Sequence, residues 1–127
     1  MGIDCFDSTY PTQNARHNTL FTMNGKIDIA KGRYIHDDNP IEDDCDCYTC
    51  TNYTKAYVCH LAKSEEPIAM RLKTYHNIAF MKRLMNEAKL AIKENRFQKF
   101  EKEFAKSFGK KKEQPEKKGK HKNVSLV

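Results

Sequence analysis

Three cysteines lie close together in the run Cys45-Asp46-Cys47-Tyr48-Thr49-Cys50, and His76 follows downstream in a stretch with helical periodicity. Thiolates and imidazoles are ligands that zinc prefers, and a Cys3His set fills a tetrahedral coordination sphere. Four protein ligands leave no open position for a substrate, so a metal held in this way is structural. We therefore predict a closed metal site, with any catalysis elsewhere in the chain.

Other chemistries fit this cysteine cluster less well. Iron–sulfur clusters usually need four cysteines, and the remaining two, Cys5 and Cys59, stand at no recognisable cluster spacing. Five cysteines cannot all pair in disulfides, and free thiols are typical of a reducing compartment. Spacing alone thus favours zinc, and it leaves the fourth ligand open among His76, His60 and Cys59.

The bulk composition indicates one small protein domain with a charged partner. The chain has 127 residues, of which 39% are hydrophobic, a thin supply for an independent core that a structural metal would supplement. No apolar run is long enough to cross a membrane and no signal peptide is recognisable, so we expect a cytoplasmic protein without a membrane partner. Residues 1–50 carry four basic and nine acidic side chains, and residues 51–127 carry nineteen and eight. The basic second part predicts a polyanionic partner such as nucleic acid.

The first part of the chain has the signals of strands and loops. Residues 1–7 are typical of a strand that runs into a loop at Asp7-Ser8-Thr9. The pair Asn24-Gly25 lies between short apolar runs and predicts a β-hairpin within residues 20–29. The segment 31–44 is rich in acids and is expected to be an irregular loop that leads into the cysteines.

The second part of the chain has the signals of helices. From Tyr53 onward, apolar residues recur at helical spacing. We expect one helix from there, a second with its N-cap at Ser64, and a longer one from Met81 to about Asn95. Phenylalanines at helical spacing follow, and we expect them to serve as core or interface: Phe97, Phe100, Phe104 and Phe108.

Several of these pieces together resemble the C-terminal part of tRNA-guanine transglycosylase of the bacterial type, also called queuine tRNA-ribosyltransferase. The matching pieces are Gly2-Ile3-Asp4-Cys5-Phe6-Asp7, Pro11-Thr12-Gln13-Asn14-Ala15-Arg16, the Cys3His set, and the segments 53–57 and 76–80. The resemblance runs from the first residue to about Phe108. It implies an enzyme that exchanges guanine in tRNA for a 7-deazaguanine base on the way to queuosine.

The resemblance implies an α/β fold, namely the C-terminal portion of a (β/α)8 TIM barrel with an attached zinc-binding subdomain and a helix-rich C-terminal half. Residues 1–30 would then supply the last barrel strand, the catalytic loop and the hairpin. Residues 31–109 would form the zinc-binding subdomain and the C-terminal helices. Residues 110–127, with seven lysines, are expected to be a disordered tail.

The resemblance also assigns roles to individual residues. It makes Asp7 the nucleophile, which in the family attacks the ribose anomeric carbon and forms a covalent intermediate that the incoming base resolves with retention. It assigns contacts with the anticodon to the loop that carries Thr12, Gln13, Asn14, Ala15 and Arg16. Gln13 departs from the bacterial pattern, which usually has a second arginine there. The resemblance also implies that the ligands of one structural zinc are Cys45, Cys47, Cys50 and His76.

The family's second catalytic aspartate and its pocket for the free base belong to the earlier barrel region, which this sequence does not contain. We therefore expect the isolated chain to bind zinc but to exchange little or no guanine, as a truncation, a fragment or one half of a split enzyme. The implied partners are the tRNA anticodon loop, a 7-deazaguanine base, and a second copy or an N-terminal barrel half. The alternative is a non-catalytic, zinc-bearing tRNA-binding or dimerisation subunit of such an enzyme. An archaeal relative that modifies the tRNA core fits less well, because that branch usually adds further RNA-binding domains.

Overall fold

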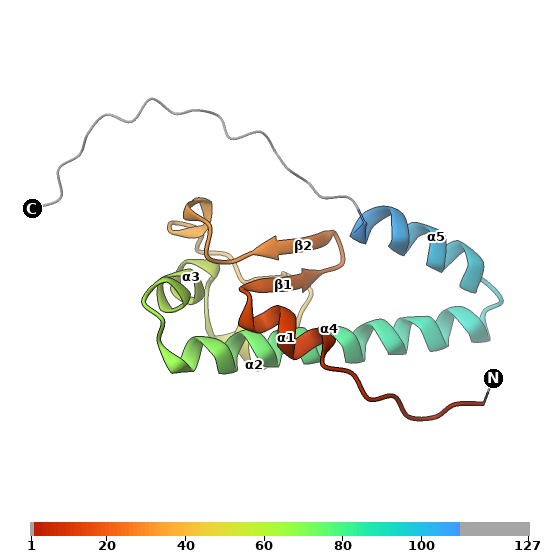
Figure 1. The fold of residues 1–127 in the computed structure, drawn as a ribbon. Helices are drawn as coiled ribbons and strands as arrows, with labels where there is room; N and C mark the ends of the chain where they lie inside the picture. Colours follow the sequence, from red (N-terminus) through yellow and green to blue (C-terminus); the bar gives the residue numbers. More distant parts are fainter. Residues whose placement is uncertain (1, 110–127) are drawn as a thin grey trace, which may run out of the picture.

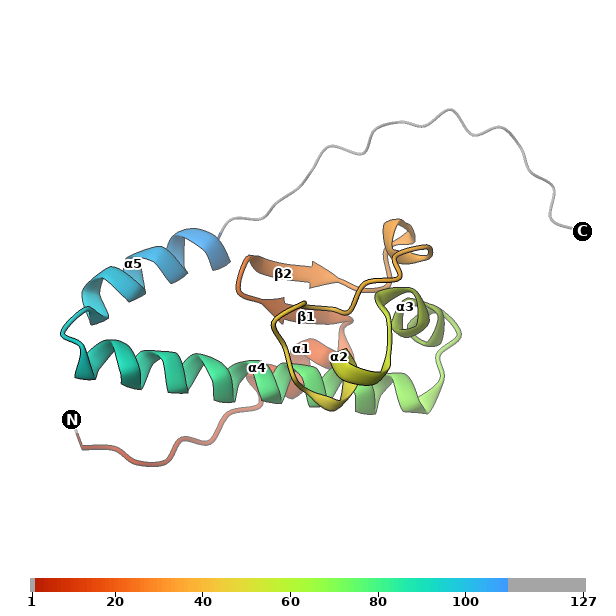
Figure 2. The ribbon, with the colours of Figure 1, turned by 180° about the vertical axis from the view of Figure 1, so that it is seen from behind.

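The computed structural model describes residues 2–109, a helix-rich α/β unit built along one long helix (Figure 1). A two-stranded antiparallel hairpin and the short first helix pack against the long helix, and the last helix folds back over its far end. Seen from behind, the cysteine loop crosses the N-terminal half of the long helix (Figure 2). In chain order the elements are α1 (Tyr10–Arg16), β1 (Thr19–Thr22), β2 (Gly25–Asp28), the 3-10 helix η1 (Gly32–Tyr34), α2 (Tyr48–Asn52), α3 (Lys55–Lys63), α4 (Pro67–Lys93) and α5 (Phe97–Phe108).

The predicted hairpin is confirmed. Thr22 pairs with Gly25, so Met23 and Asn24 form the turn between β1 and β2. Gly25 has a φ of 126°, which a side chain would oppose, so the glycine of the Asn-Gly signal takes the unusual backbone conformation. The hairpin thus depends on a residue that could be identified from the sequence.

Helix α4 is one continuous helix, where the sequence suggested two shorter ones. It ends with Asn95 at a φ of 54°, and the Arg96 N–H donates to the Ala91 carbonyl oxygen at 2.9 Å, which closes a Schellman motif. The predicted cap at Ser64 is wrong, because Ser64 follows the last residue of α3 and Glu66 precedes α4. The reason is Pro67, which fits the first turn of a helix and so fixes the start of α4.

The main core is small and includes metal-ligand candidates. Leu20 and Ile29 from the hairpin and Val58 from α3 are fully buried, and they belong to the same cluster as Cys47 and Cys50. The hairpin, the cysteine loop and α3 therefore pack as one unit. A core with so few large apolar side chains leaves room for a metal to contribute to stability.

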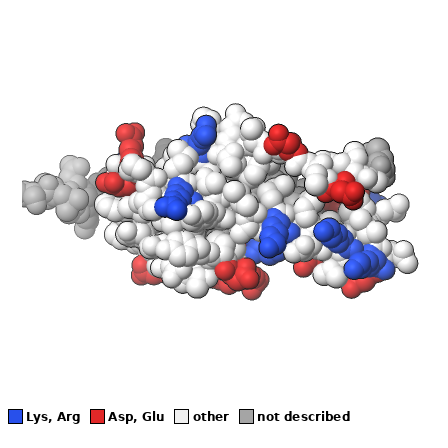
Figure 3. Space-filling model, turned by 90° about the horizontal axis from the view of Figure 1, so that it is seen from below, with Lys and Arg blue, Asp and Glu red and all other residues white. Residues whose placement is uncertain are grey.

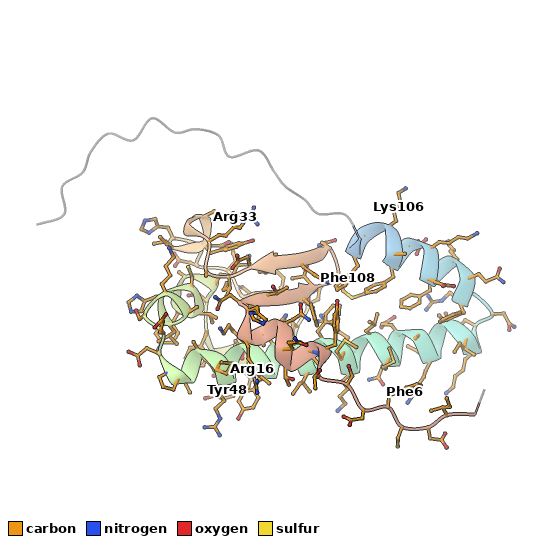
Figure 4. All side chains as sticks on the ribbon, in the orientation of Figure 1. Phe6, Arg16, Arg33, Tyr48, Lys106 and Phe108 are labelled. Carbon is orange, nitrogen blue, oxygen red and sulfur yellow. The ribbon has the colours of Figure 1, made fainter. Side chains whose placement is uncertain are left out.

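The phenylalanines of α5 form a row that faces α4 and the hairpin. Phe108 has ring centroids 5.8 Å from Phe21 and 5.9 Å from Phe80, and it stacks on Phe104 at 4.9 Å. Figure 4 shows Phe108 beside the hairpin. No residue of α5 is fully buried, and Phe97 is 40% exposed. The expectation of a packing role holds most clearly for Phe108.

Residues 2–7 form no strand in this structure and are exposed, with Phe6 80% accessible to solvent (Figures 1 and 4). A strand needs a neighbour for its backbone hydrogen bonds, and the described part of the chain offers none there. The predicted tail, residues 110–127, lies outside the described residues. No helix within residues 2–109 is long and apolar enough to span a membrane.

Candidate metal centre and nucleic-acid interface

The three cysteines and His76 meet at one point, between the cysteine loop and the middle of α4. Cys45 lies in the loop, Cys47 is the N-cap of α2, and Cys50 lies in the first turn of that helix. Their sulfur atoms are 3.8, 3.6 and 3.3 Å from His76 Nδ1, and all four ligand atoms lie within 4.8 Å of one another. The structure thus brings together the four residues that the family resemblance selected.

This geometry fits a tetrahedral metal ion. With Zn–S bonds of about 2.3 Å and Zn–N bonds of about 2.0–2.1 Å, a sulfur and a nitrogen ligand stand about 3.5 Å apart. The three observed S···N distances of 3.3–3.8 Å bracket that value. The donor set and the spacing of the residues are therefore suited to a small thiophilic cation.

The imidazole of His76 is oriented by the hairpin. His76 is fully buried, and its Nε2 lies 2.7 Å from the carbonyl oxygen of Phe21. A carbonyl oxygen can only accept a hydrogen bond, so Nε2 carries the proton and Nδ1 offers a lone pair toward the sulfurs. A hydrogen bond from the second ring nitrogen is the arrangement that metal-ligating histidines generally have.

The charges of the sulfur atoms also favour a bound cation. Hydrogen bonds with Cys45 and Cys50 lower the pKa of the Cys47 thiol to about 3. The same kind of interaction with Cys45 and Cys47 raises the pKa of Cys50 above its usual range. The first thiolate therefore forms easily, whereas the last needs a positive partner.

The other candidates for the fourth ligand lie away from the cluster. Cys59 is buried in α3, where its thiol donates to the Lys31 carbonyl oxygen at 3.6 Å. His60 is exposed on the same helix. Among the three candidates left open by spacing, the structure selects His76.

The segment predicted as an RNA-contacting loop is the helix α1. Pro11 occupies its first turn, and Ser8 Oγ accepts a hydrogen bond from the Tyr10 N–H at 3.1 Å. Thr12 Oγ1 and Asn14 Nδ2 donate to backbone carbonyl oxygens of Thr9 and Tyr10, so both side chains serve the helix itself. Pro11 suits the first turn of a helix, and the Ser8 hydroxyl satisfies a backbone N–H at its start, which favours a helix here.

Of the residues predicted to contact RNA, Gln13 and Arg16 remain available for a ligand. Both are exposed and stand three residues apart, which places them on one face of the helix. Figure 4 labels Arg16. Ala15 is fully buried, so its side chain packs inward and only its backbone could contact a ligand. The exposed part of α1 is therefore narrower than the sequence motif.

Asn77 joins α1, β1 and α4, and sequence reasoning gave it no role. It is fully buried; its Oδ1 accepts from the Phe21 N–H at 3.1 Å, and its Nδ2 donates to the carbonyl oxygens of Thr19 at 2.9 Å and Pro11 at 3.1 Å. Because α1 carries Gln13 and Arg16, Asn77 also fixes where those side chains lie. The one sequence signal that could have indicated this role is the position of Asn77, a polar amide directly after the predicted ligand His76.

The basic residues of α4 do not act as one surface. Lys82, Lys89 and Lys93 are exposed, but Arg83 pairs with Glu42 and is half-buried. Figure 3 shows basic and acidic side chains interspersed on the face seen from below. Arg83 is therefore less available to an outside partner than the three lysines are.

Asp7 lies on the exposed segment before α1, and its carboxylate is open to solvent. Asp7 lines none of the three main depressions on the described residues. A binding pocket for the nucleotide would have to be completed by residues outside this segment.

Comparison with known proteins gives consistent matches. A sequence model described as queuine tRNA-ribosyltransferase matches residues 1–110. The chain is 47% identical over 103 residues to the queuine tRNA-ribosyltransferase of Fusobacterium nucleatum, covering 81% of this chain and 28% of the relative. It is 43% identical over 108 residues to that of Bacillus subtilis, covering 85% and 28%. It is 44% identical over 112 residues to that of Thermoanaerobacter sp. strain X514, covering 88% and 30%. The chain thus spans less than a third of the length of these relatives.

Proposed function

Because the chain belongs to the queuine tRNA-ribosyltransferase family, we propose that it is the nucleophile- and zinc-bearing part of a tRNA-guanine transglycosylase. The whole enzyme would exchange the wobble guanine of a tRNA anticodon for a 7-deazaguanine base. The missing barrel portion would supply the second catalytic carboxylate and the base pocket. The match over residues 1–110, which includes the whole ligand set, is the observation that carries this proposal.

Asp7 is the proposed nucleophile. Its carboxylate oxygen attacks the anomeric carbon of the ribose, the bond to guanine breaks, and guanine leaves with the electron pair. The incoming base then attacks the same carbon and releases Asp7, so two inversions give overall retention. The exposure of residues 2–7 supports this role, since a nucleophile for a macromolecular substrate must be reachable.

Contacts with the anticodon loop are proposed for the exposed face of α1. Arg16 can donate two parallel hydrogen bonds to a phosphate or a base edge. Gln13 can hydrogen-bond a base edge but adds no charge, so this chain would rely on Arg16 for electrostatic attraction at α1. Helix α1 follows Asp7 after two residues, which would keep the recognised bases near the reacting ribose.

The proposed cofactor is one structural Zn²⁺ held by Cys45, Cys47, Cys50 and His76. When bound, the ion would tie the cysteine loop to α4 and stabilise a core that is short of large apolar side chains. His76 would keep its Nε2–H on Phe21, and through Phe21 the ion site is linked to β1. The ion would take no part in the displacement, since all four of its positions are filled by protein ligands.

A homodimer is the proposed assembly. Tyr48, Tyr53 and Tyr75 line a shallow depression with neighbouring apolar and basic side chains, and Tyr57 stacks on Tyr53 with centroids 5.2 Å apart. Tyr48 and Tyr57 are 56% and 44% exposed. Clustered exposed aromatic side chains are typical of protein interfaces, which supports self-association through this face. Sedimentation of the full chain at several concentrations, with Tyr57→Arg as the disrupting variant, tests this assembly.

Guanine exchange into tRNA tests the proposed activity. Radiolabelled guanine incorporation is measured with the full chain alone and with the chain mixed with the N-terminal barrel portion of a close relative. We expect no exchange from the chain alone and exchange from the mixture. Asp7→Asn should abolish the exchange, whereas Asp4→Asn, an exposed carboxylate in the same segment, should leave it within about twofold.

The same assay separates the proposed enzyme from its alternative. A mixture that binds tRNA through this chain but never exchanges guanine would indicate a non-catalytic, zinc-bearing tRNA-binding subunit. Exchange that survives Asp7→Asn would refute the assignment of the nucleophile. A catalytically active mixture that does not need Arg16 would refute the assignment of α1 to the anticodon.

A further inference from the structure

Arg83 lies on the face of α4 that holds the metal ligand. It follows His76 by seven residues, which is two helical turns, so both side chains project from the same side of the helix. Phe80 lies between them, and the guanidinium carbon of Arg83 stands 5.6 Å from the centre of its ring. This stacking fixes the plane of the guanidinium toward the cysteine loop.

The guanidinium holds both ends of the turn that precedes the first cysteine ligand. Its NH2 group pairs with Glu42 Oε1, and its NH1 group donates to the carbonyl oxygen of Asp44 at 3.4 Å. The Cys45 N–H donates to the Glu42 carbonyl oxygen at 3.2 Å, which closes the turn. Arg83 thus binds the turn from Glu42 to Cys45 at its first residue and at the residue before the ligand.

Glu42 connects this turn to the hairpin as well. Its Oε2 accepts a hydrogen bond from the Met23 N–H at 2.7 Å, while Oε1 takes the guanidinium. The side chains of Arg83 and Glu42 are only 25% and 13% exposed, so the ion pair is largely shielded from solvent. A shielded pair with several hydrogen bonds holds its geometry better than a surface pair does.

The guanidinium has one further buried donor beyond these contacts. Its Nε has no hydrogen-bond partner among the described residues. Cys45, the ligand at the end of the turn that Arg83 holds, is the least buried of the three ligand cysteines.

We propose that Arg83 is a positioning residue for the metal site, which holds the Glu42–Cys45 turn on α4 and so fixes where the Cys45 sulfur lies relative to His76. Three thiolates and a divalent ion leave a net charge of about −1, and the positive charge of the guanidinium beside the turn would stabilise it. The family resemblance did not place this residue at the metal site. The inference rests on the proposed zinc site, and zinc binding by the unaltered chain tests that site separately.

Zinc affinity of the full chain gives the first test. Competition with a chromogenic chelator should show that Arg83→Met weakens Zn²⁺ binding about 10–100-fold, as loss of a group that orients a ligand generally does. Arg83→Lys keeps the charge but loses the paired N–H groups of the guanidinium. Its zinc affinity should fall between those of the unaltered chain and Arg83→Met. Lys82→Met, at the exposed neighbouring position, should stay within about twofold of the unaltered chain.

Alkylation of the zinc-loaded chain by iodoacetamide gives the second test, because it reports each cysteine separately by mass spectrometry. Loss of the guanidinium that holds the Glu42–Cys45 turn should make Cys45 react several-fold faster relative to Cys47 and Cys50. Equal acceleration of all three cysteines would mean general loosening and would overturn the proposal, as would zinc affinity unchanged in Arg83→Met. If Arg83→Met does not fold, Arg83→Lys and Glu42→Gln decide by the same two readouts, and unchanged values in both overturn the proposal.

Discussion

Replacement of Asn77 tests how the described fold is held together. In Asn77→Ala, three backbone groups lose their partner: the Phe21 N–H and the carbonyl oxygens of Thr19 and Pro11. A backbone group left unsatisfied inside a protein costs about 1–3 kcal/mol, and two of these three lie in partly buried surroundings. We therefore expect a loss of about 3–6 kcal/mol in the free energy of unfolding.

Urea denaturation of the full chain at a fixed, saturating zinc concentration measures this loss. With an m-value of about 2 kcal/mol/M, a loss of about 4 kcal/mol lowers the midpoint by about 2 M. Zinc must be held constant because ligand binding adds to apparent stability by mass action. Asn86→Ala, an exposed asparagine on the same helix, is the matched control and should change stability by about 0.5 kcal/mol or less.

Asn77→Asp isolates the direction of the hydrogen bonds. Its carboxylate can still accept from the Phe21 N–H, but it presents a second oxygen to the carbonyls of Thr19 and Pro11, where the amide donated. Its cost should shrink at low pH, because a protonated carboxyl can donate to one of them. A value for Asn77→Ala within 1 kcal/mol of the unaltered chain would refute the idea that this amide joins α1 to α4.

Three further changes have defined outcomes. His76→Ala should reduce bound zinc, measured by atomic emission, from about one per chain to near zero, whereas exposed His60→Ala should leave it unchanged. Asp37→Asn should cost about 0.5–1 kcal/mol at neutral pH. Burial acts to raise the pKa of Asp37, but hydrogen bonds from Asn39 and Lys55 lower it below 3.8; the difference between variant and parent in urea should therefore vanish as pH falls through the folded-state pKa. Glu65→Gly should stabilise the chain by about 0.5–1 kcal/mol, because Glu65 has a φ of 54°, and a destabilised variant would contradict this.

The sequence was sufficient for features that depend on local chemistry. The cysteine spacing predicted the cluster of thiol ligands, and the Asn-Gly pair predicted the hairpin, because both depend on residues that are close in sequence. The choice of His76 over His60 came from family resemblance, and the structure now gives the reason: only His76 faces the sulfurs with its other nitrogen on a carbonyl oxygen. Periodicity alone could not exclude the exposed alternative.

The features that were missed depend on contacts between distant segments. Asn77 is bonded to residues more than 50 positions away, and Arg83 is paired with a residue 41 positions away. Asparagine and arginine are both common on exposed helix faces, so residue type alone does not indicate that these two side chains are buried or paired. The strand expected at residues 1–7 depends on neighbours that the described chain lacks, so its sequence alone could not decide its conformation.

Two adjacent residues of α4, His76 and Asn77, together link the candidate metal site to α1. His76 directs Nδ1 at the sulfurs and Nε2 at the Phe21 carbonyl oxygen, while Asn77 takes the Phe21 N–H and the Pro11 carbonyl oxygen. Both backbone polar groups of Phe21, its N–H and its carbonyl oxygen, are therefore held by α4, the carbonyl oxygen through the candidate metal ligand His76. Removal of the ion would free the imidazole to turn, and the bond that it makes to β1 would weaken with it. The strand and α1 share Asn77, so a bound metal would help to fix the position of the exposed Arg16 without contacting it.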